Sequence, residues 1–221
     1  MKIFQTWKSK DPETFTPIYK YCYGSWQAIH PDWEYQLYDD ADIDLYCKKN
    51  FPHYYSQFVN LPRSILRADL VRYMFMYVEG GLFVDMDFMA LKHHSEIIKK
   101  AENYDIVFGT LTDSTRDGYI PNAWIMSLKP KNTFWLNVLG VGFSRCRLNM
   151  LTVESMTGPD LIRDCIARFK PPNLLLLPPN DVYPCDWYNQ EEYKELQKWI
   201  LEGKPISIPD SYAITFWNHN W

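Results

Sequence analysis

The chain has 221 residues, of which 47% are hydrophobic and 23% are charged, and its formal net charge at pH 7 is −4. This length and composition predict one globular domain, residues 1–221, and exclude a disordered chain. The acidic balance, with no run of Lys or Arg, argues against nucleic acid as a partner, because nucleic-acid-binding domains normally carry a basic face.

The first quarter of the chain predicts alternating strands and helices. We expect strands at 2–6 and 33–38 and helices at 14–29 and 42–50. Pro12 lies near the expected start of the first helix, and Asp40 or Asp42 is expected to cap the second.

The most distinctive element is a helix expected at residues 63–79, with apolar side chains over a wide face. Gly80 and Gly81 should end it, because glycine adopts the positive φ that often follows a helix without a steric penalty. The apolar run at 82–84 predicts a buried strand. This strand leads directly into Asp85-Met86-Asp87.

The remainder of the chain continues the alternation. Further strands are expected at 105–109, 123–128 and 174–177, and further helices at 133–145, 159–169 and 191–201. The strand at 174–177 is predicted to be buried and the last helix to lie on the surface. Strands that alternate with helices indicate an α/β sandwich with a largely parallel sheet.

The cysteines and the start of the chain bear on the compartment. Five cysteines are scattered without a C-x-x-C pair, which predicts reduced, mostly buried thiols in a reducing compartment. The chain begins without the apolar stretch of a signal peptide, and no run of 18 apolar residues predicts a membrane span. We therefore expect a soluble, cytoplasmic protein, unless a membrane anchor is missing from this chain.

The two aspartates after the buried strand form a candidate metal site. Side chains at i and i+2 of a strand lie on the same side, so Asp85 and Asp87 converge if the strand geometry persists. Two close carboxylates repel each other unless a cation or a raised pKa relieves them. Ligands usually bind at the C-terminal edge of an α/β sheet, where Mg²⁺ or Mn²⁺ suits carboxylate oxygens. The alternative is an ordinary solvated pair in an exposed loop.

The segment RADLVRY at residues 67–73, with YVEGGLFVDMD at 77–87, resembles the signature of the DXD-type sugar transferases. These are glycosyltransferase family 32, which includes initiating α-1,6-mannosyltransferases, and the pattern also occurs in the glucosyltransferase domain of large bacterial toxins. Weaker matches cover most of the chain: Gln5-Thr6-Trp7, Pro121-Asn122-Ala123, Thr157-Gly158-Pro159, Tyr183-Pro184 and a Trp217…Trp221 ending.

The resemblance implies a GT-A fold, a Rossmann-like α/β/α sandwich with a mixed, mainly parallel sheet. It implies a retaining transfer of a hexose of glucose, N-acetylglucosamine or mannose type in glycan biosynthesis, with Mn²⁺ or Mg²⁺ as cofactor. The donor is expected to be a nucleotide sugar, with UDP favoured and GDP-mannose as the alternative. The acceptor is expected to be a carbohydrate or a protein-linked hydroxyl.

The resemblance also assigns roles around the DXD motif. Asp87 would ligate the metal directly, and Asp85 would reach the metal, partly through water, and the ribose. Asp69 would bind hydroxyls of the donor sugar, and Arg72 would help to place the sugar and the phosphates. Because Asp69 and Arg72 are three residues apart on one helix face, a simple local ion pair is the alternative.

Further substrate contacts are implied outside the motif. Trp7 matches the family position whose ring stacks on the nucleotide base, and Thr6 beside it is also expected to contact the substrate. The alternative interpretation is that Trp7 is a core tryptophan. Asn122 would touch the donor sugar, or else serve only a turn. Thr157 and Gly158 would place backbone N–H groups near an anionic or acceptor group at a helix start, or else only initiate that helix.

The C-terminal tail departs from the family pattern. Thr215 precedes Phe216 and Trp217 where family members often carry a His before the first tryptophan. His219, or an Asn of this tail, is therefore a candidate third metal ligand or diphosphate contact, and Trp221 is a candidate substrate contact. The alternative is that His219 is merely exposed to solvent.

No Asp or Glu stands out as a covalent nucleophile, so a front-face displacement is the expected course of the retaining reaction. A cation against the diphosphate would stabilise the charge that develops on the leaving group. Two other interpretations stay open. One is a nucleotide-sugar hydrolase or binding protein on the same fold, and the other is an unrelated metal phosphohydrolase.

Overall fold

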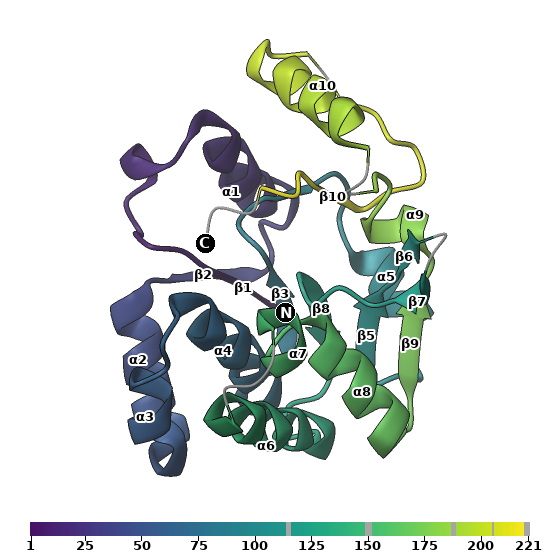
Figure 1. Cartoon of the computed structure of the whole chain (residues 1–221). Coiled ribbons are helices and arrows are strands. Elements are labelled where there is room, and N and C mark those ends of the chain that lie inside the picture. Colours follow the sequence, from purple (N-terminus) through teal and green to yellow (C-terminus); the bar gives the residue numbers. More distant parts are fainter. Residues whose placement is uncertain (114–115, 149–151, 187–188, 205, 219–221) are drawn as a thin grey trace.

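A computed structural model of the chain describes residues 1–113, 116–148, 152–186, 189–204 and 206–218. Its centre is a six-stranded sheet (Figure 1) with the order β2-β1-β3-β8-β5-β9. The strands are β1 (Lys2–Thr6), β2 (Glu34–Tyr38), β3 (Gly81–Val84), β5 (Ile106–Gly109), β8 (Trp124–Ser127) and β9 (Leu174–Leu177). β1 pairs in parallel with β2 and β3, and β5 with β9, whereas β8 is antiparallel to β3 and β5. The sheet is therefore mixed and mainly parallel, as expected.

Helices cover both faces of this sheet (Figure 1). One layer contains α2 (Asp40–Asn50), α3 (Pro52–Val59), α4 (Ser64–Val78), α6 (Thr133–Leu148) and α8 (Pro159–Phe169). The other contains α1 (Pro17–Ile29), α5 (Ser95–Lys100) and α9 (Pro179–Val182). Phe83 packs into the first layer, whereas its neighbours Leu82 and Val84 pack into the second, because successive side chains of a strand point to opposite faces.

The remaining elements are short or peripheral. They are a 3₁₀ turn (Pro12–Thr14), β4 (Phe88–Ala90), β6 (Leu111–Asp113), β7 (Arg116–Tyr119), α7 (Val153–Met156), α10 (Gln190–Leu201) and β10 (Ala213–Thr215). β10 pairs with β4 in antiparallel orientation, which brings the C-terminal segment beside the end of β3. No helix of the described residues combines the length and the apolar character that a membrane crossing requires.

The glycine pair after α4 acts as predicted. Gly80 has φ +70° and Gly81 φ +98°, values that other residues rarely adopt. A Cβ atom at Gly81 would lie 2.7 Å from the carbonyl oxygen of Lys2 on the neighbouring strand. The pair therefore both ends the helix and lets β3 approach β1.

Three expectations about these elements need correction, and one helix was missed. The cap of α2 is Asp39, not Asp40 or Asp42: its carboxylate accepts from the Asp42 N–H at 2.9 Å, and Asp42 accepts from the Asp39 N–H in return. α1 begins at Pro17 rather than at residue 14, because Pro12 starts a separate 3₁₀ turn. β9 lies at the edge of the sheet, so only Leu177 of its four residues is buried. The helix α3 was not expected at all.

Candidate functional site

The DXD motif lies in a turn between β3 and β4. The Phe88 N–H donates to the Asp85 carbonyl at 3.1 Å, and the Asp85 N–H donates to Ala123 next to β8 at 2.8 Å. Strand geometry thus ends before the motif, and the argument from alternation along a strand was wrong for this pair. Asp85 and Asp87 nevertheless line the same two pockets, because the turn, rather than the pleat, brings both carboxylates to one place.

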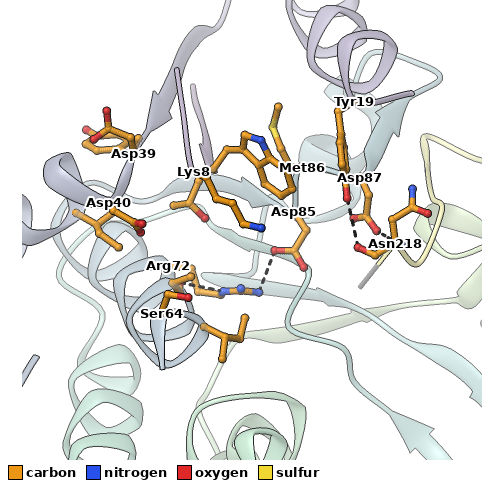
Figure 2. Close-up of a pocket in the computed structure, with 16 residues that line it drawn as sticks. Lys8, Tyr19, Asp39, Asp40, Ser64, Arg72, Asp85, Met86, Asp87 and Asn218 are labelled. Carbon is orange, nitrogen blue, oxygen red and sulfur yellow. Dashed lines mark hydrogen bonds and ion pairs between the residues drawn. The ribbon is translucent and has the colours of Figure 1, made fainter. Parts of the chain in front are cut away.

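Arg72 on α4 connects the motif to the helix. Its Nη1 atom lies 3.2 Å from Asp85 Oδ1, and its Nη2 atom lies 2.9 Å from Asp69 Oδ1. Figure 2 shows the guanidinium lying below the Asp85 carboxylate. The same Nη1 donates to the Asn122 carbonyl at 2.7 Å, and the guanidinium lies over the Phe83 ring at 4.6 Å. The local ion pair of Asp69 and Arg72 is therefore real, and it forms the buried base of the site.

Asp69 is held by three side chains. Besides Arg72, it accepts hydrogen bonds from Asn122 Nδ2 at 3.0 Å and from Thr157 Oγ1 at 2.8 Å. Asn122 also donates to the Tyr73 hydroxyl at 3.0 Å, so it is a buried member of this network and not only a turn residue. Three segments far apart in the sequence are thereby fixed around one carboxylate.

The backbone amides of Thr157 and Gly158 do not serve the predicted purpose. Both N–H groups donate to the Val153 carbonyl, at 2.9 and 3.2 Å. They are therefore not free for an anionic ligand. Gly158 precedes α8 and lines a pocket, and a Cβ atom there would lie 2.9 Å from the Cα of Glu154, so close packing is its evident role.

The charges of the site are unbalanced. Asp69, Asp85 and Asp87 surround one guanidinium, that of Arg72. Burial, with smaller contributions from Asp87 and Asp69, raises the pKa of Asp85 to about 7 against the opposing effect of Arg72. Burial raises the pKa of Asp87 to about 6, although hydrogen bonds from the Asn218 N–H and the Thr215 hydroxyl oppose this.

This imbalance fits a divalent cation. Mg²⁺ is usually held by one or two carboxylates together with phosphate oxygens of a substrate, and the excess negative charge of Asp85 and Asp87 suits that arrangement. No cluster of three or more His, Cys, Asp or Glu side chains suited to a metal occurs within the described ranges. The carboxylate pair fits such a shared protein–substrate site.

One pocket, the Trp7 pocket, opens on the β1 side of the motif. It has a volume of about 690 Å³, including space open to solvent, and its lining includes Thr6, Trp7 and Lys8. The half-buried Trp7 ring packs against Tyr19 with centroids 4.6 Å apart and also faces the pocket, so the two interpretations of Trp7 are compatible. Figure 2 shows Lys8 extending toward Asp85.

A second pocket, the Asn122 pocket, opens on the other side. Its volume is about 760 Å³, including space open to solvent. It shares Ile65, Arg72, Asp85 and Asp87 with the Trp7 pocket. Its other lining residues are Asp69, Tyr119, Pro121, Asn122, Ala123, Val153, Glu154, Gly158, Pro159, Thr215 and Trp217. The DXD motif and Arg72 therefore lie between two cavities.

The tail reaches the motif through Thr215 and Asn218, neither of which was among the predicted site residues. The Asn218 N–H donates to Asp87 Oδ2 at 2.8 Å, and Thr215, where relatives often carry His, bonds the same carboxylate (Figure 2 shows Asn218). His219 and Trp221 lie outside the described residues. Lys8, Glu154 and Trp217 were also not among the predicted site residues; the signals available were the position of Lys8 directly after Trp7 and the match of Trp217 in the chain's ending.

In comparisons with known proteins, the chain matches glycosyltransferases. Residues 16–104 match the family model described as a glycosyltransferase sugar-binding region containing a DXD motif. The chain is 36% identical over 86 residues to inositol phosphoceramide mannosyltransferase 3 of Schizosaccharomyces pombe. This alignment covers 38% of this chain and 23% of that protein. It is 26% identical over 170 residues to the initiation-specific alpha-1,6-mannosyltransferase of Candida albicans, which covers 75% of this chain and 41% of that protein. The chain thus matches less than half of the length of these relatives.

Solved structures agree on the fold. The PaToxG glycosyltransferase superposes with a TM-score of 0.54 at 17% identity, over 92% of this chain and 78% of that one. The galactosyltransferase LgtC, solved with donor and acceptor sugar analogues, gives a TM-score of 0.54 at 8% identity, over 99% and 88%. The architecture is the GT-A fold, as the resemblance implied.

Proposed function

We propose that this chain is a retaining, metal-dependent glycosyltransferase, because residues 16–104 match the model of a glycosyltransferase sugar-binding region that contains a DXD motif. It moves a hexose from a nucleotide sugar to a hydroxyl acceptor. The observation that carries the proposal is the placement of Asp85, Asp87 and Arg72 between two pockets. One pocket can take the nucleotide, the other the sugar and acceptor, and the reacting bond then lies over the carboxylate pair.

The Trp7 pocket would bind the nucleotide part of the donor. The Trp7 ring offers an aromatic face for the base, next to Thr6, and Lys8 supplies a positive charge in the same pocket for a phosphate. Asp87 and Asp85 would hold Mn²⁺ or Mg²⁺ against the diphosphate. The cation, when bound, lowers the energy of the charge that grows on the leaving group.

The transferred sugar lies in the inner part of the Asn122 pocket. There Asp69 and Asn122 can bind its hydroxyls, and Arg72 can contact both the sugar and the phosphate oxygens. The buried bonds among these three residues fix their positions before a ligand binds, which is how preorganised sites gain catalytic power. Gly158, which lines this pocket, lets the start of α8 pack closely against the backbone of Glu154.

The relatives bear on the sugar. Their names describe mannosyltransferases, which favours mannose among the hexoses. GDP-mannose therefore belongs beside the UDP-sugars that the resemblance favours as donor. We propose further that residues 1–221 form one such domain. The five cysteines are all buried and free, which supports work in a reducing compartment.

Retention of configuration would follow from a front-face displacement. Asp69 is unsuited to be a covalent nucleophile, because Arg72, Asn122 and Thr157 hold its carboxylate in place and stabilise its negative charge, although an oxygen can still accept from a sugar hydroxyl. The acceptor hydroxyl then attacks beside the departing phosphate, and its proton passes to that phosphate. Incubation with donor alone followed by intact-protein mass spectrometry tests this course; a glycosyl adduct on the protein contradicts it.

The activity itself is tested by product formation. The wild type with Mn²⁺, UDP-sugars or GDP-mannose, and manno-oligosaccharides should yield a new glycoside. The double variant Asp85→Asn and Asp87→Asn should yield none while it retains the circular dichroism spectrum of the wild type. Release of free sugar without any glycoside across the acceptor panel would favour the hydrolase interpretation, and unchanged turnover by the double variant would contradict the metal role.

A further inference from the structure

The outer wall of the Asn122 pocket is built from residues without a role in donor binding. Trp217 and Glu154 lie on this wall, and neither lines the Trp7 pocket. Glu154 is exposed on the short helix α7, and Trp217 is half-buried in the segment after β10. A ligand in this outer part would approach the reaction centre from the side opposite to the nucleotide.

Trp217 has a rare backbone conformation, and contacts of its side chain hold it in place. Its φ is +50°, in the left-handed region that a bulky residue rarely adopts. Its indole N–H donates to the Cys185 carbonyl at 3.1 Å, and its ring stacks on Tyr183 with centroids 5.7 Å apart and an interplanar angle of 21°. Strain of this kind at a pocket wall is commonly retained for function. A fixed indole offers a flat apolar surface of the type that packs against a pyranose ring.

The charges of the Asn122 pocket select against an anionic ligand. Its described lining includes the carboxylates of Asp69, Asp85, Asp87 and Glu154, and Arg72 is its only cation. That guanidinium pairs with Asp69 and Asp85 and, in the proposed function, serves the phosphate of the donor rather than the acceptor. A phosphate on the acceptor unit directly beside Glu154 would therefore meet repulsion from its carboxylate, since a further cation, Arg63, lines the neighbouring hollow rather than this pocket; hydroxyl groups could instead donate to the carboxylate.

The cavity continues beyond Glu154. Ile65, Val153 and Glu154 also line a neighbouring hollow that extends to Pro62, Arg63 and Ser64. The shared residues make the two cavities one groove that leads from the reaction centre across the start of α4. An acceptor longer than one sugar unit has room to follow this groove.

We propose that Trp217 and Glu154 form the acceptor subsite, which takes a neutral hexose unit of an oligosaccharide. The hexose ring packs on the indole, and its hydroxyls donate to the Glu154 carboxylate. The inference rests on the proposed function and adds the class of acceptor to it. Several relatives are named for an inositol phosphoceramide acceptor, which carries a phosphate; the proposed subsite disfavours such a phosphate directly beside Glu154.

The subsite is tested by binding rather than by turnover, so that the correct sugar donor need not be known. Ligand-observed NMR titrations with Mg²⁺ and saturating UDP or GDP should show binding of mannotriose by the wild type and much weaker binding of inositol 1-phosphate. Glu154→Gln should raise the mannotriose Kd about tenfold, because a hydrogen bond to a charged group is worth about 1.5–3 kcal/mol. Trp217→Leu should raise it as well, and Glu154→Lys should narrow the preference for mannotriose over inositol 1-phosphate.

Matched controls separate a local effect from a general one. Glu195→Gln and Trp199→Ala change an exposed carboxylate and an exposed indole on α10 and should leave the mannotriose Kd unchanged. Equal binding of both probes by the wild type, binding of neither, or a wild-type mannotriose Kd in both Glu154→Gln and Trp217→Leu would overturn the subsite. Failure of the wild type to bind any nucleotide with Mg²⁺ would instead contradict the proposed function.

Discussion

Arg72 is the single side chain on which most of the site depends. Its guanidinium is 1% exposed and faces two carboxylates, a carbonyl and an aromatic ring. Removal of one partner of a buried ion pair leaves an uncompensated charge, and two such charges would be left at Asp69 and Asp85. The residue therefore serves stability and chemistry together, and its substitution cannot be interpreted from activity alone.

We expect Arg72→Ala to lower the free energy of unfolding by about 3–5 kcal/mol. Arg67→Ala is the matched control, because Arg67 lies on the same helix and pairs with Asp44 at 2.8 Å in a more exposed position. That pair should be worth less than about 1 kcal/mol. Urea denaturation of both variants measures the difference, and equal losses would show that Arg72 is no more critical than an ordinary surface arginine.

Trp7 carries a second prediction at this scale. Trp7→Ala should weaken binding of the nucleoside diphosphate, UDP or GDP, by roughly 1–3 kcal/mol, because base–aromatic stacking is lost. Trp199→Ala on the exposed side of α10 is the control for removal of an indole. Isothermal titration calorimetry with Mn²⁺ present gives the Kd; an unaltered Kd in Trp7→Ala would leave Trp7 as only a packing partner of Tyr19.

At the scale of elements, local signals predicted α4, β3 and α8 well. They could not predict features that depend on contacts between residues distant in sequence. The glycine pair fixed the boundary between α4 and β3, because its positive φ values are a local property. β4 and β10 were missed, since each has three residues and neither is a strand without the other, more than a hundred residues away. The burial of β9 was overestimated because an apolar run does not reveal that its strand lies at a sheet edge.

The glycine pair offers a prediction about this boundary. Gly81→Ala should lower the free energy of unfolding by more than about 1 kcal/mol, because its φ of +98° is strained for alanine and the added Cβ would lie 2.7 Å from the Lys2 carbonyl. Gly24→Ala is the control: Gly24 is inside α1 with no atom within 4 Å of an added Cβ. Alanine there should stabilise by about 0.5–1 kcal/mol. Thermal unfolding of both variants should give shifts of opposite sign.

At the scale of the whole molecule, the site joins segments that the chain keeps far apart. Motif resemblance predicted Asp69, Arg72, Asp85 and Asp87, and the fold brings all four together between the two pockets. It matched Trp217 only as part of the chain's ending and gave Glu154 no role, although Thr157 and Gly158 close to Glu154 were expected at the site. Only the pairing of β10 with β4 and the packing of α7 against α8 bring these residues to one cavity.

The raised pKa values of the carboxylate pair link the stability of the whole molecule to pH. Burial raises the pKa of Asp85 to about 7 and that of Asp87 to about 6, above the usual value of 3.8. The metal-free folded protein thus retains protons that the unfolded chain has already lost. The stabilising contribution of this pair is therefore largest at low pH and is lost as the pH rises from about 4 to about 7.

The stabilisation that bound metal and nucleotide add should increase with pH, opposite to the contribution of the metal-free carboxylate pair. Below pH 6 the cation must displace protons from Asp87 and Asp85, and above pH 7 it meets two free carboxylates. We expect Mn²⁺ with UDP or GDP at a hundredfold excess over Kd to stabilise the protein by about 2.7 kcal/mol, or roughly 5–10 °C in Tm for a domain of this size. The increment should be larger at pH 8 than at pH 5.5 and should vanish with EDTA. The double variant Asp85→Asn and Asp87→Asn should show no metal-dependent increment at either pH, and a wild-type increment that is equal at both pH values would mean that the cation binds elsewhere.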